Sequence, residues 1–237
     1  IRICIVGDSY IEALQVHHKS SVAEYLENSL RNTGKPVGGY RFGISGAPLS
    51  HYIYMIENEI LKYRPDIIIV NMVHNDLLES LNPAIGTYSA SFSKLIYDAG
   101  GREMLSSPQP YRRKLSWLLK TTATFRYFWV RKQFHSSSLK RMWSYLSQQG
   151  VGNDNPVYSA NIEIKSVKDT KVALTIDALF NMLTQIRRNN EVELLLVIDG
   201  DRSSIAKGID EGKDITSLVG GINRKVAVAA DKYSLPL

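Results

Sequence analysis

The first ten residues, IRICIVGDSY (1–10), decide the predicted fold of this chain. Their apolar, mostly β-branched run stops at Gly7, and such a run is typical of a short strand that is buried on both faces of a parallel sheet. Asp8 and Ser9 then stand at the carboxyl end of that strand, which is the edge where open α/β sheets bind ligands. A purely local interpretation also exists, because Asp and Ser are favoured in turns and helix caps. The rest of the chain has to separate the two interpretations.

Predicted strands and helices alternate along the 237 residues. Three more strands are expected at 38–42, 67–72 and 192–198, and a further one begins at 235. Hydrophobic spacing predicts helices at 19–33, 50–63, 172–188 and 215–233. This alternation favours a mostly parallel sheet with helices on both faces, joined by right-handed crossovers. The predicted fold class is therefore a three-layer α/β/α sandwich.

Between residues 83 and 166 the alternation is interrupted, and prolines and glycines are frequent. Two helical stretches are expected inside this segment, at 89–98 and 114–149. Long connections in compact domains usually carry function or structure of their own. We therefore predict a single domain over residues 1–237 with a helical insertion, or lid, at 83–166.

The chain is basic, with a formal net charge of +6. Much of the excess lies at 112–141, where aromatic residues are interleaved. Basic and aromatic residues together can bind nucleic acid, an anionic polysaccharide or a membrane surface. No nucleic-acid motif accompanies them, so the solvated face of a helical subdomain is the favoured interpretation. No apolar run is long enough to span a bilayer.

Few features of the sequence point to a metal or a cofactor. Cys4 is the single cysteine, which excludes an internal disulfide, and its place in the first strand predicts a small buried hydrophobe. No His/Cys cluster has the spacing of metal ligands. No Gly-x-Gly-x-x-Gly or Walker pattern occurs. Neither a cofactor nor a metal is therefore expected.

Polar or small residues recur directly after each predicted strand. Ser9 follows the first strand, Gly46 lies in the glycine-rich connection after the second, and Asn75 follows the third. Asp199 and Asp201 follow the fourth. Because the carboxyl ends of parallel strands share one edge of the sheet, these residues are expected to meet there.

Three of these residues offer the groups that ester hydrolysis requires. A serine mechanism needs an activated hydroxyl, donors for the developing oxyanion, and a base oriented by a third group. Ser9 could supply the hydroxyl and one backbone donor, while the N–H of Gly46 and the carboxamide of Asn75 could supply two more. Glycine suits position 46 because, without a Cβ, its N–H can approach a ligand closely.

The same residues resemble the SGNH/GDSL hydrolase family in three blocks. Gly7-Asp8-Ser9 is similar to its first block, Gly43-Ile44-Ser45-Gly46-Ala47 to its second, and His74-Asn75-Asp76 to its third. The resemblance implies a flavodoxin-like sheet, Ser9 as the nucleophile, and Gly46 and Asn75 as oxyanion donors. It covers residues 1–82 well and 169–237 only as a pattern.

Neighbours of these residues complete the expected site. Asp8, His74 and Asp76 are expected to line the substrate, and Asp8 is also expected to brace its turn by accepting backbone N–H bonds. His74 stands where the family usually has glycine or another small residue, so it could narrow the site or add a polar group to it.

The resemblance departs most at the family's last block, Asp-x-x-His, which supplies the base and its orienting acid. That block is not found here, and it normally follows a strand similar to 234–237, so we expect it beyond Leu237. His51 and His74 are the nearest substitutes among the five histidines. An ordinary polar role is the more common one for both. The chain opens on Ile inside a core strand, so a preceding segment is expected, and both an exported and a cytoplasmic location stay open.

The leading hypothesis is a serine ester hydrolase that removes an O-acyl group, most simply O-acetyl, from a carbohydrate or small ester. Two alternatives stay open. One is an O-acyltransferase that acts on a polysaccharide, and the other is a non-catalytic carbohydrate-binding module derived from such a hydrolase. The expected partner is a small-molecule or carbohydrate ester; nucleic acid is not expected, and membrane association through the basic segment has no support.

Overall fold

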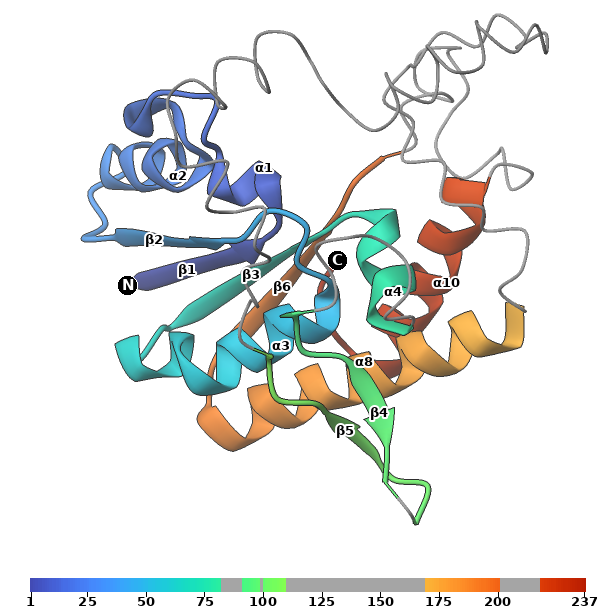
Figure 1. Ribbon diagram of the computed structural model, residues 1–237. Coiled ribbons are helices and arrows are strands. Elements are labelled where there is room, and N and C mark those ends of the chain that lie inside the picture. The colour runs from blue at the N-terminus through green and yellow to red at the C-terminus, as the bar shows by residue number, and fades with distance from the viewer. Residues whose placement is uncertain (82–90, 99, 110–168, 201–217) are drawn as a thin grey trace, which may run out of the picture. The chain divides into compact units, whose positions relative to one another are not determined.

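The computed structural model describes residues 1–81, 91–98, 100–109, 169–200 and 218–237, all of which belong to one compact unit (Figure 1). Most of the insertion expected at 83–166 lies outside the described residues, including its predicted helix at 114–149. The lid and the single-domain organisation therefore stay predictions.

A four-stranded parallel sheet forms the centre of this unit, in the order β2-β1-β3-β6. Its strands are β1 (Arg2–Gly7), β2 (Gly38–Gly43), β3 (Ile67–Met72) and β6 (Glu193–Ile198). The register sets Gly7 beside Gly43, so β1 and β2 end together at one edge. The predicted α/β class with a mostly parallel sheet is confirmed.

The central strand β1 is buried on both faces, as its sequence predicts. Ile3 and Ile5 join Ile11, Ala23 and Val37 in one hydrophobic cluster. Cys4 and Val6, which alternate with them, are fully buried as well. Burial raises the pKa of the Cys4 thiol to about 11, so the prediction of a small buried hydrophobe is confirmed.

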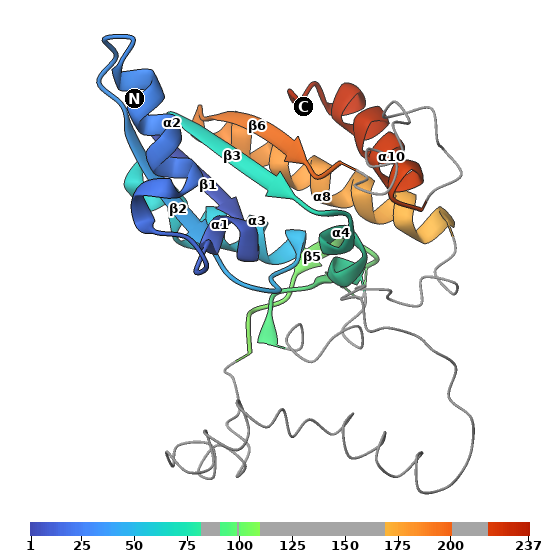
Figure 2. The ribbon, with the colours of Figure 1, turned by 90° about the horizontal axis from the view of Figure 1, so that it is seen from above.

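Helices pack on both faces of the sheet (Figure 2), although Leu195 and Val197 leave one face of β6 exposed. The helix α2 (Val22–Arg31) packs on β2, while α3 (Leu49–Asn58) packs on β1 and contacts α8 (Asp169–Asn190), and α10 (Leu218–Tyr233) packs on α8. Shorter elements complete the described chain: α1 (Ser9–Glu12), η1 (His18–Ser20), η2 (Ile60–Tyr63) and α4 (His74–Leu81). The four long predicted helices are confirmed, with small shifts at their ends.

The helix predicted at 89–98 is wrong over its described part. Leu95–Tyr97 forms the strand β4, which pairs antiparallel with β5 (Glu103–Leu105). Contacts with α3 fix this hairpin: Ser50 Oγ donates to the Ser93 carbonyl at 2.8 Å, and the Ser93 N–H donates to His51 Nδ1 at 3.2 Å. Such long-range bonds decide the conformation where local helix preference is weak.

Two smaller differences concern segment ends. The helix α4 is not predicted, because the polar run after β3 has the composition of a connection. The strand expected to begin at 235 is not formed, although the Leu196 N–H donates to the Pro236 carbonyl at 2.8 Å and so holds this segment beside β6. Both segments lie at the sheet, one at the carboxyl end of β3 and one along β6.

Candidate active site

Ser9 begins the single helical turn α1 directly after β1. Asp8 caps this turn, since its Oδ1 accepts the Tyr10 N–H at 2.9 Å and its carbonyl accepts the N–H groups of Ile11 and Glu12. The Asp8 side chain is buried, whereas Ser9 is only half-buried. The prediction that Asp8 braces the turn is therefore confirmed, and the turn presents Ser9 at the carboxyl edge of the sheet.

Two glycines let α1 sit directly on the strand ends. A Cβ at Gly43 would lie 2.0 Å from the Glu12 backbone nitrogen, and a Cβ at Gly7 would lie 2.5 Å from Ile11 Cγ1. Neither contact is sterically allowed, so only glycine fits at these two positions. The close packing fixes the place of Ser9 relative to β1 and β2.

The loop that carries Gly46 is tied to the same turn. The Ile44 N–H donates to the Gly7 carbonyl at 3.1 Å, and the Glu12 carboxylate accepts both the Ser45 N–H, at 2.8 Å, and the Ser45 hydroxyl. Gly46 is exposed and has φ +74°, a left-handed conformation that favours glycine. Among the described residues its N–H donates to no other group, so it can donate to a ligand.

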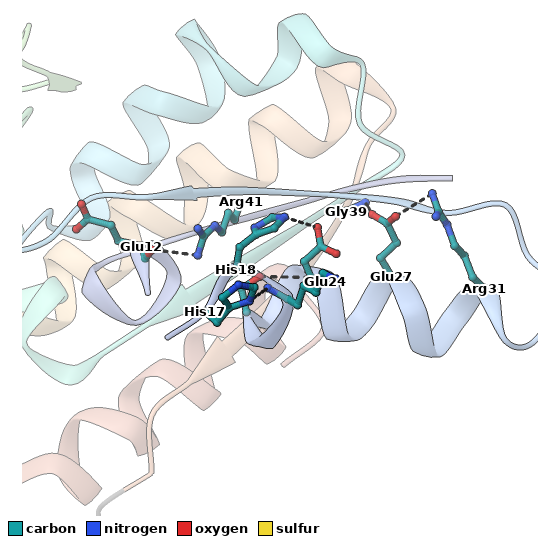
Figure 3. A network of polar contacts seen from close by, with 10 residues as sticks. Glu12, His17, His18, Glu24, Glu27, Arg31, Gly39 and Arg41 are labelled. Atoms are coloured by element: carbon teal, nitrogen blue, oxygen red, sulfur yellow. Dashed lines mark hydrogen bonds and ion pairs between the residues drawn. The ribbon is translucent and has the colours of Figure 1, made fainter. Parts of the chain in front are cut away.

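Glu12 is a residue of this site that the sequence analysis missed. It joins α1 to the Gly46 loop through its carboxylate, and Arg41 Nη1 donates to its carbonyl at 3.0 Å (Figure 3). A lone glutamate in a short helix carries no pattern that distinguishes it from a solvated residue. Only the folded chain reveals that it binds Ser45, 33 residues further along the chain.

Asn75 lies half-buried in the first turn of α4, directly after β3. Its Nδ2 donates to Glu79 Oε1 at 3.1 Å, one turn further along the helix. His74 is its half-buried neighbour at the start of α4. The helix thus presents Asn75 and His74 at the carboxyl end of β3.

Asp76 does not lie where the sequence analysis expects it. The side chain is only 1% exposed, and its Oδ2 accepts the Val73 N–H at 2.8 Å and the Tyr52 hydroxyl at 2.9 Å. A contact with substrate does not fit this burial. Asp76 instead fixes the start of α4, because it satisfies a backbone donor at the helix N-terminus and binds α4 to α3.

Carboxylates from three strand ends influence one another at this edge. Burial, followed by the charge of Asp199, raises the pKa of Asp8. Burial also raises the pKa of Asp76 well above its usual range, and the charge of Asp8 adds to that shift. These carboxylates follow β1, β3 and β6, which lie in this order in the sheet, so their charges act along one edge of it.

The residue after β6, Asp199, also belongs to this edge. Its N–H donates to the Met72 carbonyl at 3.0 Å, and its own carbonyl accepts Asn223 Nδ2 at 2.9 Å. It is therefore held between β3 and α10. Asp201, the second carboxylate expected here, lies outside the described residues.

Three of the histidines that could replace the missing base have hydrogen-bond partners outside the three blocks. His51 is 7% exposed, accepts the Ser93 N–H at Nδ1, and stacks on Tyr54. Burial, and secondly the charge of Lys94, lowers its pKa to about 4, so it is neutral and internal at ordinary pH. His17 Nδ1 accepts the Lys19 N–H, and His18 Nε2 pairs with Glu24 Oε1 at 3.0 Å (Figure 3). His135 lies outside the described residues.

Neither a metal cluster nor a membrane-spanning helix is found in the described ranges. No three His, Cys, Asp or Glu side chains gather there in a way that could hold a metal ion. None of the helices in these ranges combines the length and the apolar content needed to cross a bilayer.

Comparison with solved structures finds distant likenesses only. TesA aligns with 99% of this chain and 76% of its own length, at 10% identity and a TM-score of 0.48. AlinE4, described as an SGNH-hydrolase family esterase, aligns with 100% of this chain and 74% of its own, at 13% identity and a TM-score of 0.44. The acetyl xylan esterase AlAXEase aligns with 100% and 76%, at 14% identity and a TM-score of 0.44. No family model and no curated protein sequence matches the chain.

Proposed function

We propose that this protein is a serine ester hydrolase of the SGNH type, which removes an O-acyl group, most simply O-acetyl, from a carbohydrate or small ester. The observation that carries the proposal is the sheet order β2-β1-β3. It makes the segments that follow these strands neighbours, and those segments carry Gly46, Ser9 and Asn75 in turn. The Gly46 loop is in addition bonded to Gly7 and Glu12, on either side of Ser9.

In the proposed reaction, Ser9 Oγ attacks the carbonyl carbon of the ester, and a base takes the hydroxyl proton. The negative charge that develops on the carbonyl oxygen is stabilised by the N–H groups of Ser9 and Gly46 and by Asn75 Nδ2. Collapse of the tetrahedral intermediate breaks the bond to the alcohol, which leaves with the proton. Water then attacks the acyl-serine and passes a proton to the base. Collapse of the second tetrahedral intermediate breaks the bond to Ser9 Oγ, which takes that proton back from the base, and the acid is released.

The base is proposed to come from the Asp-x-x-His block that the resemblance implies after Leu237. His51 supports this proposal indirectly, because it is buried and its Nδ1 accepts the Ser93 N–H. His74 is proposed to lie against the substrate from the start of α4. Asp8 is proposed to act there only through the turn that it braces, and Asp76 through the helix that it fixes.

The test is the hydrolysis of p-nitrophenyl acetate by the full-length protein and by its Ser9→Ala variant. The proposal expects turnover by the parent protein and a loss of at least about a thousandfold in the variant. Ser29→Ala is the matched control, since Ser29 is exposed on α2 and away from the strand ends. Turnover that survives in Ser9→Ala contradicts a serine mechanism, and inactivity of the full-length parent towards this ester and acetylated sugars favours a binding module instead.

A further inference from the structure

A groove of about 490 Å³ opens beside Ser9, between α1 and the junction of η1 with α2. Ser9 and Tyr10 line it from α1, Ala13 and Val16 from the turn after α1, and Val22 from the first turn of α2. The volume falls within the usual range of small-molecule sites, roughly 300–1,000 Å³. The groove therefore has room for a small ligand that lies against Ser9.

The lining of this groove is apolar but interrupted by hydrogen-bonding groups. Tyr10, Val16 and Val22 are 51%, 48% and 47% exposed, which is unusually open for apolar side chains that lie together. Gln15 and Ser20 line the groove as well. An aromatic ring with aliphatic neighbours suits the C–H face of a sugar ring, and the polar groups suit its hydroxyls.

A long acyl chain suits the groove less well. Such a chain gains most from an enclosed, wholly apolar cavity, because its transfer from water drives binding. Covering Gln15 and Ser20 with an alkyl chain would also deprive them of water without offering a partner. The mixed lining therefore favours a ligand that carries its own hydroxyl groups.

Both walls of the groove are held in place by polar contacts (Figure 3). On the side of η1, the contact of His18 Nε2 with Glu24 Oε1, 3.0 Å long, holds this short helix against α2. The helix α2 is bound to β2 by Glu27, whose Oε2 accepts the Gly39 N–H at 2.6 Å. On the side of α1, Arg41 holds the Glu12 carbonyl. A groove with fixed walls loses little conformational entropy when a ligand binds.

We propose that this groove binds the sugar ring that bears the ester, with Tyr10 and Val22 against the ring face and Gln15 and Ser20 at its hydroxyls. The inference rests on the proposed function, because it assigns the alcohol side of the substrate to the groove and leaves the acyl carbonyl at Ser9. It makes Tyr10 a residue that determines specificity, and it narrows the substrate class from esters in general to O-acylated sugars.

The experiment compares two acetyl esters in the full-length protein, methyl 6-O-acetyl-glucoside, whose other hydroxyls are free, and p-nitrophenyl acetate. Tyr10→Ala is expected to lower kcat/KM for the glucoside, relative to kcat/KM for p-nitrophenyl acetate, about tenfold. Most of this loss should come from a higher KM for the glucoside. Gln15→Ala, a change in an exposed loop that spares the fold, is expected to lower the ratio about threefold. Tyr25→Ala is the matched control, because Tyr25 is an exposed tyrosine on α2 that does not line the groove. Its ratio should equal that of the parent.

An unchanged ratio in both Tyr10→Ala and Gln15→Ala overturns the inference while leaving the proposed function intact. If Tyr10→Ala instead lost activity selectively towards p-nitrophenyl octanoate, the inference would be overturned as well, since the groove would then hold the acyl chain. Binding of the acetylated glucoside to Ser9→Ala, followed by ligand-observed NMR, tests the groove without turnover. Addition of Tyr10→Ala should abolish that binding, and binding that persists contradicts the inference whether or not the protein is an esterase.

Discussion

Asn75 and Glu79 form a hydrogen-bonded pair along α4, in which Asn75 Nδ2 donates to Glu79 Oε1 at 3.1 Å. One amide hydrogen of Asn75 is thus bonded to Glu79. This bond fixes the orientation of the carboxamide, so the second hydrogen on the same nitrogen has a fixed direction too. This matters for an oxyanion donor, because a carboxamide that turned its oxygen towards the negative charge would repel it. Glu79 therefore has the place of a positioning residue for Asn75.

Removing either member of this pair should slow the proposed reaction. Asn75→Ala should lower kcat for p-nitrophenyl acetate by about 10²–10³-fold, as for the loss of one oxyanion donor. Glu79→Ala should lower kcat about tenfold with little change in KM, because Asn75 remains but is no longer oriented. Glu79→Gln keeps an acceptor oxygen and should recover most of that loss. Glu79→Ala with parental kcat would show that Asn75 needs no orientation.

Replacing Gly46 separates its backbone conformation from its proposed role as a donor. Gly46 and Gly34 have φ values of +74° and +84°, and a Cβ at Gly34 would meet nothing within 4 Å. Gly46→Ala and Gly34→Ala should each lower the free energy of unfolding by about 1 kcal/mol, as urea unfolding would measure. Alanine keeps the backbone N–H, but the shift that relieves its left-handed φ moves this N–H away from the proposed oxyanion. Only Gly46→Ala should therefore lose esterase activity, by about 10²-fold or more. Equal activity in the two variants would remove Gly46 from the site.

The strands and the edge residues could be predicted because their signals are local. The run at 1–6 and the glycine that stops it are visible in any ten-residue window, and parallel strands bring the residues after their carboxyl ends to one edge. The hairpin β4–β5 could not be predicted, because it depends on bonds from Ser50 and His51 that span more than 40 residues. The role of Asp76 could not be predicted for a related reason. Its place next to Asn75 in the motif suggests contact with the substrate. Its burial, however, depends on Tyr52 of another helix, which accounts for the different role.

The buried His51 should make the protein less stable in acid. Its pKa is about 4 in the folded chain against about 6.5 when unfolded, so the unfolded state binds a proton first as the pH falls. The contribution of His51 to the free energy of unfolding is fully present above about pH 6.5. As the pH falls from about 6.5 to 4 it is lost, by about 3 kcal/mol in total. His51→Asn keeps an acceptor for the Ser93 N–H and cannot titrate. The difference in unfolding free energy between parent and variant should therefore change across this window, and a constant difference would contradict a neutral, buried His51.

The effect of Asp76 on the pH dependence of stability should have the opposite sign. Burial raises its pKa well above the usual range, so the folded state holds the proton to higher pH than the unfolded state does. Stability from this group is fully present below the unfolded pKa and falls as the pH rises through the folded pKa. Asp76→Asn should accordingly gain stability relative to the parent as the pH is raised from 5 to 9, in thermal unfolding. Asp76→Ala, which leaves the Val73 N–H and the Tyr52 hydroxyl without their acceptor, should lose about 1–3 kcal/mol. A pH-independent gap between parent and Asp76→Asn would contradict the raised pKa.

Covalent labelling of the full-length protein with a fluorophosphonate probes Ser9 most directly, because such reagents react with an activated serine hydroxyl. Peptide mass spectrometry should find one phosphonylated residue, Ser9, with the adduct absent from Ser9→Ala and formed much more slowly in Asn75→Ala. An adduct on a different serine, or no adduct under conditions that label a known serine esterase, would contradict the assignment of Ser9 as the nucleophile.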